Sequence, residues 1–192
     1  MKIGVFLARM QPIHNAHLYL IEKALKECEQ VYVVLGSDNK ENMLRNPYDI
    51  ALREEMLREC IKENDHLFVF TLPDWSTEGD TGNAKMWGRY FYYNVVSRIR
   101  QKTFSIYYSD DPAILDSWFK GTEIADAITY RLFERSNMMD GLSATKIRQA
   151  FIDGNKEYIK KYCPEPVVKR FDMLAEKYKE VAGNPVKDYA MT

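Results

Sequence analysis

Residues 2–17 read KIGVFLARMQPIHNAH, and this stretch decides the fold. Its first part, Lys2–Ala8, is a short apolar run of the kind that forms a buried strand. A loop that contains Pro12 follows, and from His14 onward the apolar residues recur at helical spacing. We therefore expect a buried strand, a short turn and an amphipathic helix whose first turn carries histidine.

The same alternation of apolar runs and helical patterns continues along the chain. The predicted strands are 2–8, 31–35, 67–72, 104–108 and 127–133. The predicted helices are 14–28, 46–61 with Asn46 as N-cap and Pro47 at its first position, 86–101, a short helix from 111, 143–154 and 167–181. This order predicts an α/β fold, a Rossmann-like parallel sheet with helices on both faces and a helical C-terminus. We expect one domain over 1–192, with 165–192 as a C-terminal helical extension.

Polar loops follow the predicted strands at four places along the chain. They are 8–14, 36–46, 73–87 and 109–112. In parallel sheets the ligand lies beyond the carboxyl ends of the strands, at the point where the strand order reverses. The four loops should therefore meet at one edge of the sheet and form one site.

Composition excludes several classes of protein. The chain has 192 residues, 46% of them hydrophobic and 29% charged, which is typical of a globular protein with a core. The net charge of -1 argues against nucleic-acid or membrane partners, so any phosphate-binding charge must be local. Cys28, Cys60 and Cys163 are far apart and form no C-x-x-C pair. This usage favours neither a metal site nor a disulfide framework, and it fits a cytoplasmic protein.

The turn after the first strand has the features of a phosphate site. His14 and His17 are three residues apart in the first helical turn and face the same way. A helix N-terminus offers free N–H groups, to which both imidazoles could add donors and, if protonated, positive charge. Arg9 could reach the same ligand as a bidentate fork. The alternative is that the two histidines are a helix cap and a surface residue.

A second helix start has a similar composition. Ser143 and Thr145 place hydroxyls at the beginning of a predicted helix, and Arg148 faces the same way as Thr145, with Lys146 as a further charge. An ordinary N-cap beside a solvated arginine is the alternative for this segment taken alone. Together the two helix starts predict a clamp for a polyphosphate.

The residues at the two helix starts resemble the motifs of a known family. Gly4-x-Phe6-x-x-Arg9-x-x-Pro12-x-His14-x-x-His17 resembles the first-strand motif of the HxGH nucleotidylyltransferase superfamily. Ser143-x-Thr145-x-x-Arg148 resembles that superfamily's S-T-x-x-R-type signature. Within the superfamily the chain looks most like the archaeal-type nicotinamide-mononucleotide adenylyltransferases and the adenylyltransferase half of the bifunctional adenylyltransferase–Nudix enzymes. The supporting stretches are 33–37, 45–47, Asp74-Trp75 and Trp87, and the resemblance covers roughly residues 1–165.

The resemblance implies an adenylyltransferase that joins ATP and nicotinamide mononucleotide to give NAD and pyrophosphate. It implies Mg²⁺ bound mainly by the ATP phosphates, with no metal cage of protein ligands. The implied catalytic residues are Arg9, His14, His17 and Arg148. The implied ATP-binding residues are Phe6, Leu7, Ala8, Arg9, His14, His17, Ser109, Asp110, Ser143, Thr145 and Arg148. The implied mononucleotide-binding residues are Gly36, Ser37, Arg45, Asn46, Asp74, Trp75 and Trp87.

The resemblance places the nicotinamide ring near two loop residues. Trp87 is the expected platform for the cationic ring, with Trp75 as a second candidate. Asp74 is expected to accept a hydrogen bond from the ring carboxamide. The alternative for Trp87 is packing against Phe91 and Val95 in the core.

The chain departs from the family pattern at three places. Ala16 stands where the family usually has Gly, but the position should be helical, so we expect activity to survive. Ser109 replaces the usual leading Gly of an acidic turn, and 76–85 is longer than usual. Two alternatives stay open: the same chemistry on another acceptor (nicotinate mononucleotide, phosphopantetheine or cytidylyl transfer), or a non-catalytic nucleotide-binding regulator. A homo-oligomer is possible, but no face for it is identified.

Overall fold

The computed structural model describes residues 1–61, 64–74 and 83–184. Its centre is a five-stranded sheet with the strand order β3-β2-β1-β4-β5. All four strand pairs are parallel, as the alternating sequence pattern predicts. The strands are β1 (Ile3–Ala8), β2 (Gln30–Gly36), β3 (Leu67–Leu72), β4 (Phe104–Tyr108) and β5 (Ile128–Leu132). The order reverses between β1 and β4, so this is the switch point at which a ligand is expected.

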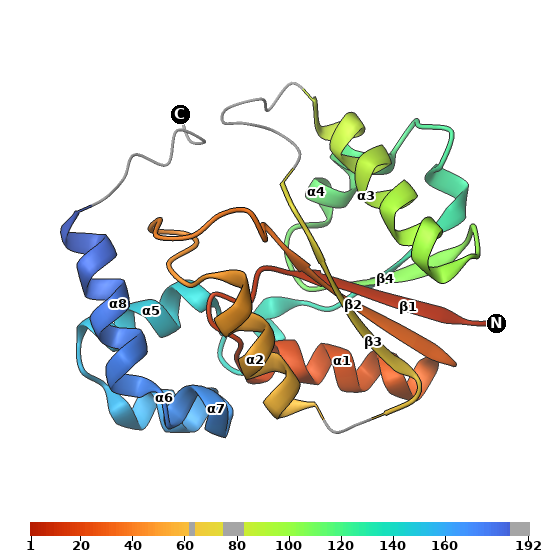
Figure 1. The fold of residues 1–192 in the computed structure, drawn as a ribbon. Coiled ribbons are helices and arrows are strands. Elements are labelled where there is room, and N and C mark those ends of the chain that lie inside the picture. Colours follow the sequence, from red (N-terminus) through yellow and green to blue (C-terminus); the bar gives the residue numbers. More distant parts are fainter. Residues whose placement is uncertain (62–63, 75–82, 185–192) are drawn as a thin grey trace.

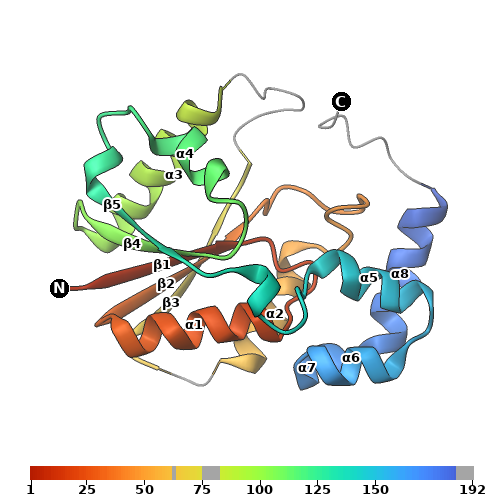
Figure 2. The ribbon, with the colours of Figure 1, turned by 180° about the vertical axis from the view of Figure 1, so that it is seen from behind.

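Helices cover both faces of the sheet (Figure 1). They are α1 (Asn15–Glu27), α2 (Ile50–Cys60), α3 (Ala84–Ile99), α4 (Pro112–Phe119), α5 (Ala144–Ile152), α6 (Lys156–Tyr162), α7 (Glu165–Val168) and α8 (Phe171–Gly183). Helices α1 and α2 lie on one face, and α3 and α4 lie on the other (Figures 1 and 2). The last four helices form a group beside α2. The predicted Rossmann-like fold with a helical C-terminus is therefore confirmed.

The core has two parts because alternate residues of each strand face opposite ways. Phe6 packs with α1, α2 and the C-terminal helices, whereas the neighbouring Val5 packs with α3 and α4. Helices α3 and α4 approach closely at Gly88, where an added Cβ would lie 2.4 Å from the carbonyl oxygen of Trp118. A side chain at position 88 would therefore force these two helices apart.

The predicted start of the second helix is wrong. Helix α2 begins at Ile50, and its cap is Asp49, whose carboxylate accepts a hydrogen bond from the Leu52 N–H at 2.8 Å. The backbone N–H of Tyr48 is instead bound by the Gln11 side chain at 3.0 Å. Asn46 and the residues after it lie in a loop that this long-range hydrogen bond ties to Gln11, where local capping signals predict a helix.

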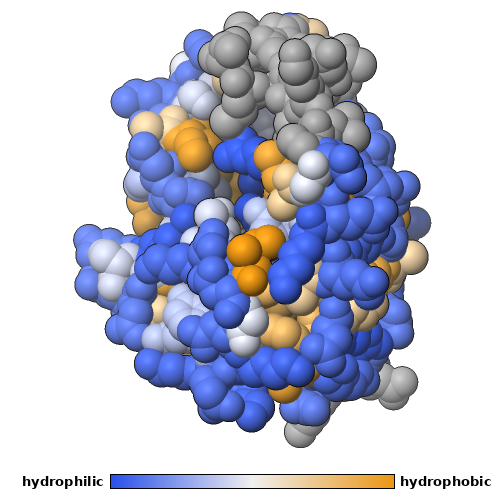
Figure 3. Space-filling view, turned by 90° about the vertical axis from the view of Figure 1, so that its left-hand side faces the viewer, coloured by the Kyte–Doolittle hydropathy of each residue, from blue (hydrophilic) through white to orange (hydrophobic). Residues whose placement is uncertain are grey.

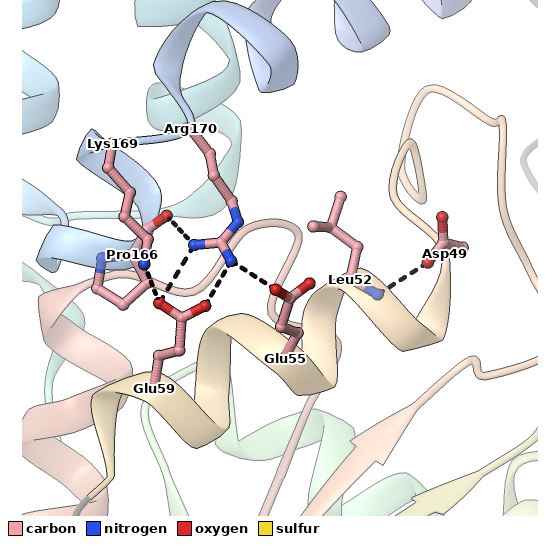
Figure 4. A network of polar contacts seen from close by, with 7 residues as sticks. All are labelled: Asp49, Leu52, Glu55, Glu59, Pro166, Lys169 and Arg170. Carbon is pink, nitrogen blue, oxygen red and sulfur yellow. Dashed lines mark hydrogen bonds and ion pairs between the residues drawn. The ribbon is translucent and has the colours of Figure 1, made fainter.

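The predicted last helix is divided into α7 and α8 at Lys169–Arg170, and α6 was not predicted. Figure 4 shows that both residues of the break turn toward α2. Lys169 and Arg170 form ion pairs with Glu59, and Arg170 also contacts Glu55 at 2.7 Å. The break therefore docks the C-terminal helices onto the outer side of α2.

The surface on the α8 side of the molecule is mostly hydrophilic, and its hydrophobic residues lie in small separate groups (Figure 3). Within the described ranges, no helix has the length and apolar character that crossing a bilayer would require. The three cysteines are free thiols. The single-domain division stays a prediction.

Candidate active site

A cavity of about 300 Å³ opens at the carboxyl ends of β1 and β4, at the switch point of the sheet. The loops after β1, β4 and β5 and the first turns of α1 and α5 contribute its walls. All of the residues predicted to bind ATP line it: Phe6, Leu7, Ala8, Arg9, His14, His17, Ser109, Asp110, Ser143, Thr145 and Arg148. The structure therefore brings the two sequence motifs, which are more than 120 residues apart, into one site.

The two histidines are stacked at the start of α1. Their ring centroids are 3.7 Å apart, with an angle of 15° between the planes. His14 is the N-cap residue, and its backbone N–H donates to Nδ1 of His17 at 3.2 Å. Because Nδ1 of His17 accepts this hydrogen bond, the neutral ring carries its proton on Nε2. His17 is thereby prepared to donate from Nε2 to a bound anion.

Burial keeps both imidazoles neutral. Burial, reinforced by the nearby charge of Arg135, lowers the pKa of His14 to about 3. Burial, together with His14 and Arg135, also holds the pKa of His17 well below its usual range. The histidines of the free protein are therefore hydrogen-bonding groups and not the cations considered in the sequence analysis.

Arginines supply the positive charge of the cavity. The described lining residues include Arg9, Arg45, Arg135 and Arg148 and a single carboxylate, that of Asp110. Arg135 donates to Asp110 at 2.8 Å. A chain with a net charge of -1 thus concentrates positive charge at the place where the sequence predicts a polyphosphate.

Arg148 is held firmly between the two helix starts. It is 7% exposed, and it donates to the backbone carbonyl of Gln11 at 2.8 Å and to the Thr145 hydroxyl at 3.3 Å. Its Nε has no partner among the described residues, and the same is true of Nδ1 of His14. Buried polar atoms without partners are costly. Both atoms belong to residues that line the cavity.

The second helix start combines the two interpretations of the sequence. Ser143 is the N-cap of α5, since its hydroxyl accepts from the Lys146 N–H at 3.3 Å, and it also lines the cavity. The Lys146 ammonium donates to the carbonyl oxygen of Asp140 at 2.8 Å. Lys146 is not a lining residue, so the expected extra charge at this helix start does not come from it.

Several lining residues escaped the sequence reasoning. They are Met10, Gln11, Ala16, Tyr108, Arg135, Leu142 and Ala144. Ala16 is predicted only as a departure from the family motif and not as a binding residue. A signal existed for Arg135, because it follows β5 as the other site loops follow their strands. No local signal existed for Gln11, whose side-chain amide forms two hydrogen bonds with the backbone of Tyr48, at 2.9 and 3.0 Å.

The residues predicted for the mononucleotide are more scattered. Arg45 lines the cavity, whereas Gly36, Ser37, Asn46, Asp74 and Trp87 are not among its described lining residues, and Trp75 lies outside the described residues. The carboxylate of Asp74 accepts from the Ser37 hydroxyl at 3.0 Å and pairs with Lys40 at 3.2 Å. It is therefore already engaged by two donors.

Trp87 is half-buried on α3 and belongs to the part of the core that α3 and α4 share. Its ring centroid lies 5.4 Å from that of Tyr90 and 6.0 Å from that of Trp118. These contacts agree with the alternative of core packing, because Trp87 packs against the cluster that contains Phe91 and Val95. A role as a platform for the nicotinamide ring stays a prediction.

Ala16 is helical and lies in the first turn of α1, as expected. It is 4% exposed and lines the cavity between the two histidines. Within the described ranges, no group of three or more His, Cys, Asp or Glu residues is placed to hold a metal ion. A cation at this site would therefore depend on ligands that a substrate brings.

Comparison with known proteins gives a consistent picture. The family model described as cytidylyltransferase-like matches residues 5–184. A nicotinamide-nucleotide adenylyltransferase of Thermococcus kodakarensis is 28% identical over 158 residues, which cover 80% of this chain and 74% of the relative. One of Thermococcus onnurineus is 28% identical over 185 residues, which cover 91% of this chain and 89% of the relative.

The fold is also found among solved structures. A bifunctional NMN adenylyltransferase/ADP ribose pyrophosphatase of Francisella tularensis, complexed with AMP and a manganese ion, is similar with a TM-score of 0.65 and 21% identity. The likeness covers 95% of this chain but only 52% of that one, so this chain spans about half of the bifunctional protein. Because the family model covers nearly all of the sequence, the chain belongs to the cytidylyltransferase-like family.

Proposed function

We propose that this chain is a nucleotidyltransferase that joins ATP and nicotinamide mononucleotide to give NAD and pyrophosphate. The observation on which the proposal mainly rests is the cavity where two helix N-termini, a stacked histidine pair and four arginines meet. The archaeal relatives named nicotinamide-nucleotide adenylyltransferase, matched over most of their length, support the acceptor.

The reaction needs alignment and charge stabilisation more than acid–base chemistry. An oxygen of the mononucleotide 5′-phosphate attacks the α-phosphorus of ATP, the new P–O bond forms, and the bond to the β-phosphate oxygen breaks. The attacking group is already an anion, so no protein base has to remove a proton from it. The protein has to hold two anionic groups together and stabilise the charge that moves onto pyrophosphate.

The lining residues divide this work between neutral donors and cations. In our proposal, Nε2–H of His17 and the neighbouring His14 donate to oxygens of the α- and β-phosphates, between which the P–O bond breaks. Arg9 and Arg148 neutralise the triphosphate, and Arg45 contacts the acceptor phosphate. Arg135, which pairs with Asp110 in the free protein, is a further cation at the same cavity.

A divalent cation fits this site if the substrate brings most of its ligands. The single carboxylate among the described lining residues, Asp110, is paired with Arg135, and no cluster of potential ligands lies in the described ranges. Mg²⁺ typically keeps several waters and binds substrate phosphates in such sites. When bound, it would supply Lewis-acid neutralisation of the phosphate oxygens.

A second acceptor is favoured by one contact. Lys40 lies 3.2 Å from the Asp74 carboxylate, and the two side chains are only 18% and 25% exposed. If the ring binds beside Asp74, as the family resemblance implies, this ammonium offers a partner for a ring carboxylate. Nicotinate mononucleotide is therefore the second candidate acceptor.

The test is product formation by the purified protein. ATP and Mg²⁺ are incubated with nicotinamide mononucleotide, nicotinate mononucleotide or phosphopantetheine, and CTP replaces ATP in a parallel series. Dinucleotide and pyrophosphate are both quantified. We expect NAD and pyrophosphate in equal amounts from the first acceptor.

Two results would contradict the proposal in different ways. If nicotinamide mononucleotide gives no dinucleotide while another acceptor is consumed, the acceptor assignment is wrong. If ATP binds but pyrophosphate is not released with any of the acceptors, the chain is a nucleotide-binding regulator and not an enzyme.

A further inference from the structure

A fully buried arginine joins the loops that follow the first two strands. Arg53 of α2 is 0% exposed and is one of the largest completely buried side chains of the described residues. One of its terminal nitrogens donates to the carbonyl oxygens of Arg9 at 2.7 Å and Gly36 at 2.9 Å. The other donates to the Ser37 carbonyl at 3.0 Å. The guanidinium thus forms hydrogen bonds with the backbone at the ends of two different strands.

These contacts begin where the pairing of β1 with β2 ends. The β1–β2 ladder finishes at the pair Ala8 and Leu35, and the next residues along the two strands are Arg9 and Gly36. Their carbonyl oxygens both accept from Arg53. The guanidinium therefore continues the connection between the two strands past the last β-ladder pair.

The backbone at this point is in an unfavourable conformation. Met10 has a φ of 51° and Ser37 a φ of 53°, in the left-handed region that non-glycine residues rarely adopt. Met10 directly follows one carbonyl that Arg53 holds, and the carbonyl of Ser37 is another. Strained residues persist only where the surroundings over-determine them. Arg53 provides part of that constraint on both loops.

Stability alone is a poor explanation for a cation in this place. Burial lowers the pKa of Arg53 to about 10, which reflects the cost of removing the guanidinium from water. Its hydrogen bonds to the described residues go to backbone carbonyls, including that of Asp49 at 3.4 Å, and not to carboxylate oxygens. A planar group with five donors, however, is well suited to fix several carbonyls at set distances.

We infer that Arg53 is a positioning residue that holds the ATP side and the acceptor side of the site in register. This inference rests on the proposed function, in which Arg9 binds ATP and the 36–46 loop, with Arg45, binds the mononucleotide. Helix α2 is a suitable reference for both, because Glu55 and Glu59 on its other side are paired with Arg170 (Figure 4). Arg53 touches no substrate and acts through the two loops.

The test compares Arg53→Met and Arg53→Lys with the control Glu59→Gln. The first variant removes every guanidinium donor, the second keeps a cation with fewer donors, and the control loosens α2 on its outer side. Misplacing reacting groups by about 1 Å costs on the order of 10²-fold in rate. We expect Arg53→Met to lower kcat by about this factor while the KM of each substrate stays within about threefold, and Arg53→Lys to recover part of the loss. Glu59→Gln should lower Tm without changing kcat.

A second measurement does not require turnover. Hydrogen exchange of the 36–46 amides is compared with and without ATP. If Arg53 couples the two loops, ATP protects these amides in the wild-type protein and protects them less in Arg53→Lys. This readout separates the two proposals, because ATP can protect the loop even if no acceptor is adenylylated.

Two outcomes would overturn the inference. One is a lowered Tm with kcat within about threefold of wild type in Arg53→Met, which would make the residue purely structural; if that variant does not fold, the same criterion applies to Arg53→Lys. The other is an ATP-induced protection of 36–46 that is equal in the wild type and the variant.

Discussion

The phosphate end and the acceptor end of the proposed site differ in how their residues are brought together. At the phosphate end, every residue predicted for ATP lines one cavity, although the two motifs lie more than 120 residues apart. At the acceptor end, Arg45 is the only predicted residue within the described ranges that lines the same cavity. Asp74 is paired with Lys40, and Trp87 packs against Tyr90 and Trp118.

The difference has a physical cause. A phosphate site is made by helix N-termini and short motifs, whose geometry depends on residues close in sequence. The residues predicted for the acceptor instead meet partners that are distant in sequence, as Asp74 meets Ser37 and Lys40. No local sequence pattern predicts such pairs. Substitutions of single residues at each end test this contrast.

The largest expected effect is at the phosphate end, for His17→Ala. His17 lines the cavity, and its Nδ1 is already bound to the His14 N–H, which leaves Nε2 to donate to a phosphate. Loss of one preorganised donor of this kind typically costs 10²–10³-fold in kcat, or about 2.7–4 kcal/mol. Steady-state kinetics with saturating ATP measure the loss.

The matched control is His66→Ala, which removes the exposed histidine before β3, outside the cavity. Its kcat should equal that of the wild type. Near-normal turnover in His17→Ala would disprove the phosphate role of His17. The phosphate end would then be no better predicted from the sequence than the acceptor end.

The fold itself was more predictable than either end. Strands β3 and β4 have the predicted bounds, because short apolar runs between turn residues leave little choice. The errors lie where distant residues override local signals. Gln11 holds Tyr48 and delays α2 until Asp49, and the pairing of Arg170 with Glu55 accompanies a break in the predicted last helix. The stacked, neutral state of the histidines also depends on burial, which the sequence does not display.

The next prediction concerns that burial. The pKa of His14 is lowered to about 3 in the folded protein and is near 6.5 in an unfolded chain. Between these values the unfolded state binds more protons, so the free energy of unfolding falls as pH falls from 6.5 toward 3. The contribution of His14 is at most about 1.4 kcal/mol per pH unit. His14→Asn removes this group.

Urea unfolding at pH 6.5, 5.5 and 4.5 tests the effect. We expect the wild type to lose more stability than His14→Asn, by up to about 2.7 kcal/mol over the two pH units. Carboxylates contribute equally to both proteins and cancel in the difference. Parallel curves for the two proteins would mean that His14 titrates normally and is not held neutral by burial.

A smaller effect is expected for Arg135, the cation of the phosphate end that sequence reasoning missed. Arg135→Ala removes one of the cavity's arginines, so the KM for ATP should rise about tenfold, or about 1.4 kcal/mol, and depend less on salt. Arg131→Ala is the control, since Arg131 pairs with Glu27 at 2.6 Å and is not a lining residue. Equal KM values for the two variants would remove Arg135 from the binding site.

The smallest predicted effect lies at the acceptor end, for Lys40→Met. This change leaves the Asp74 carboxylate with the Ser37 hydroxyl but without its cation. A less compensated carboxylate should favour a cationic carboxamide ring over a ring that bears its own carboxylate. The ratio of kcat/KM for nicotinamide mononucleotide to that for nicotinate mononucleotide should therefore rise about fivefold, or about 1 kcal/mol.

Lys120→Met, which removes an exposed lysine paired with Asp116 on α4, should leave the ratio unchanged. If Lys40→Met also leaves it unchanged, Asp74 does not face the ring. The acceptor would then be recognised elsewhere, and the weaker prediction at this end would reflect a wrong location and not only the difficulty of predicting long-range pairs. A shift in the ratio would instead place the Lys40–Asp74 pair beside the ring, and the acceptor end would then join the phosphate end as a located part of one site.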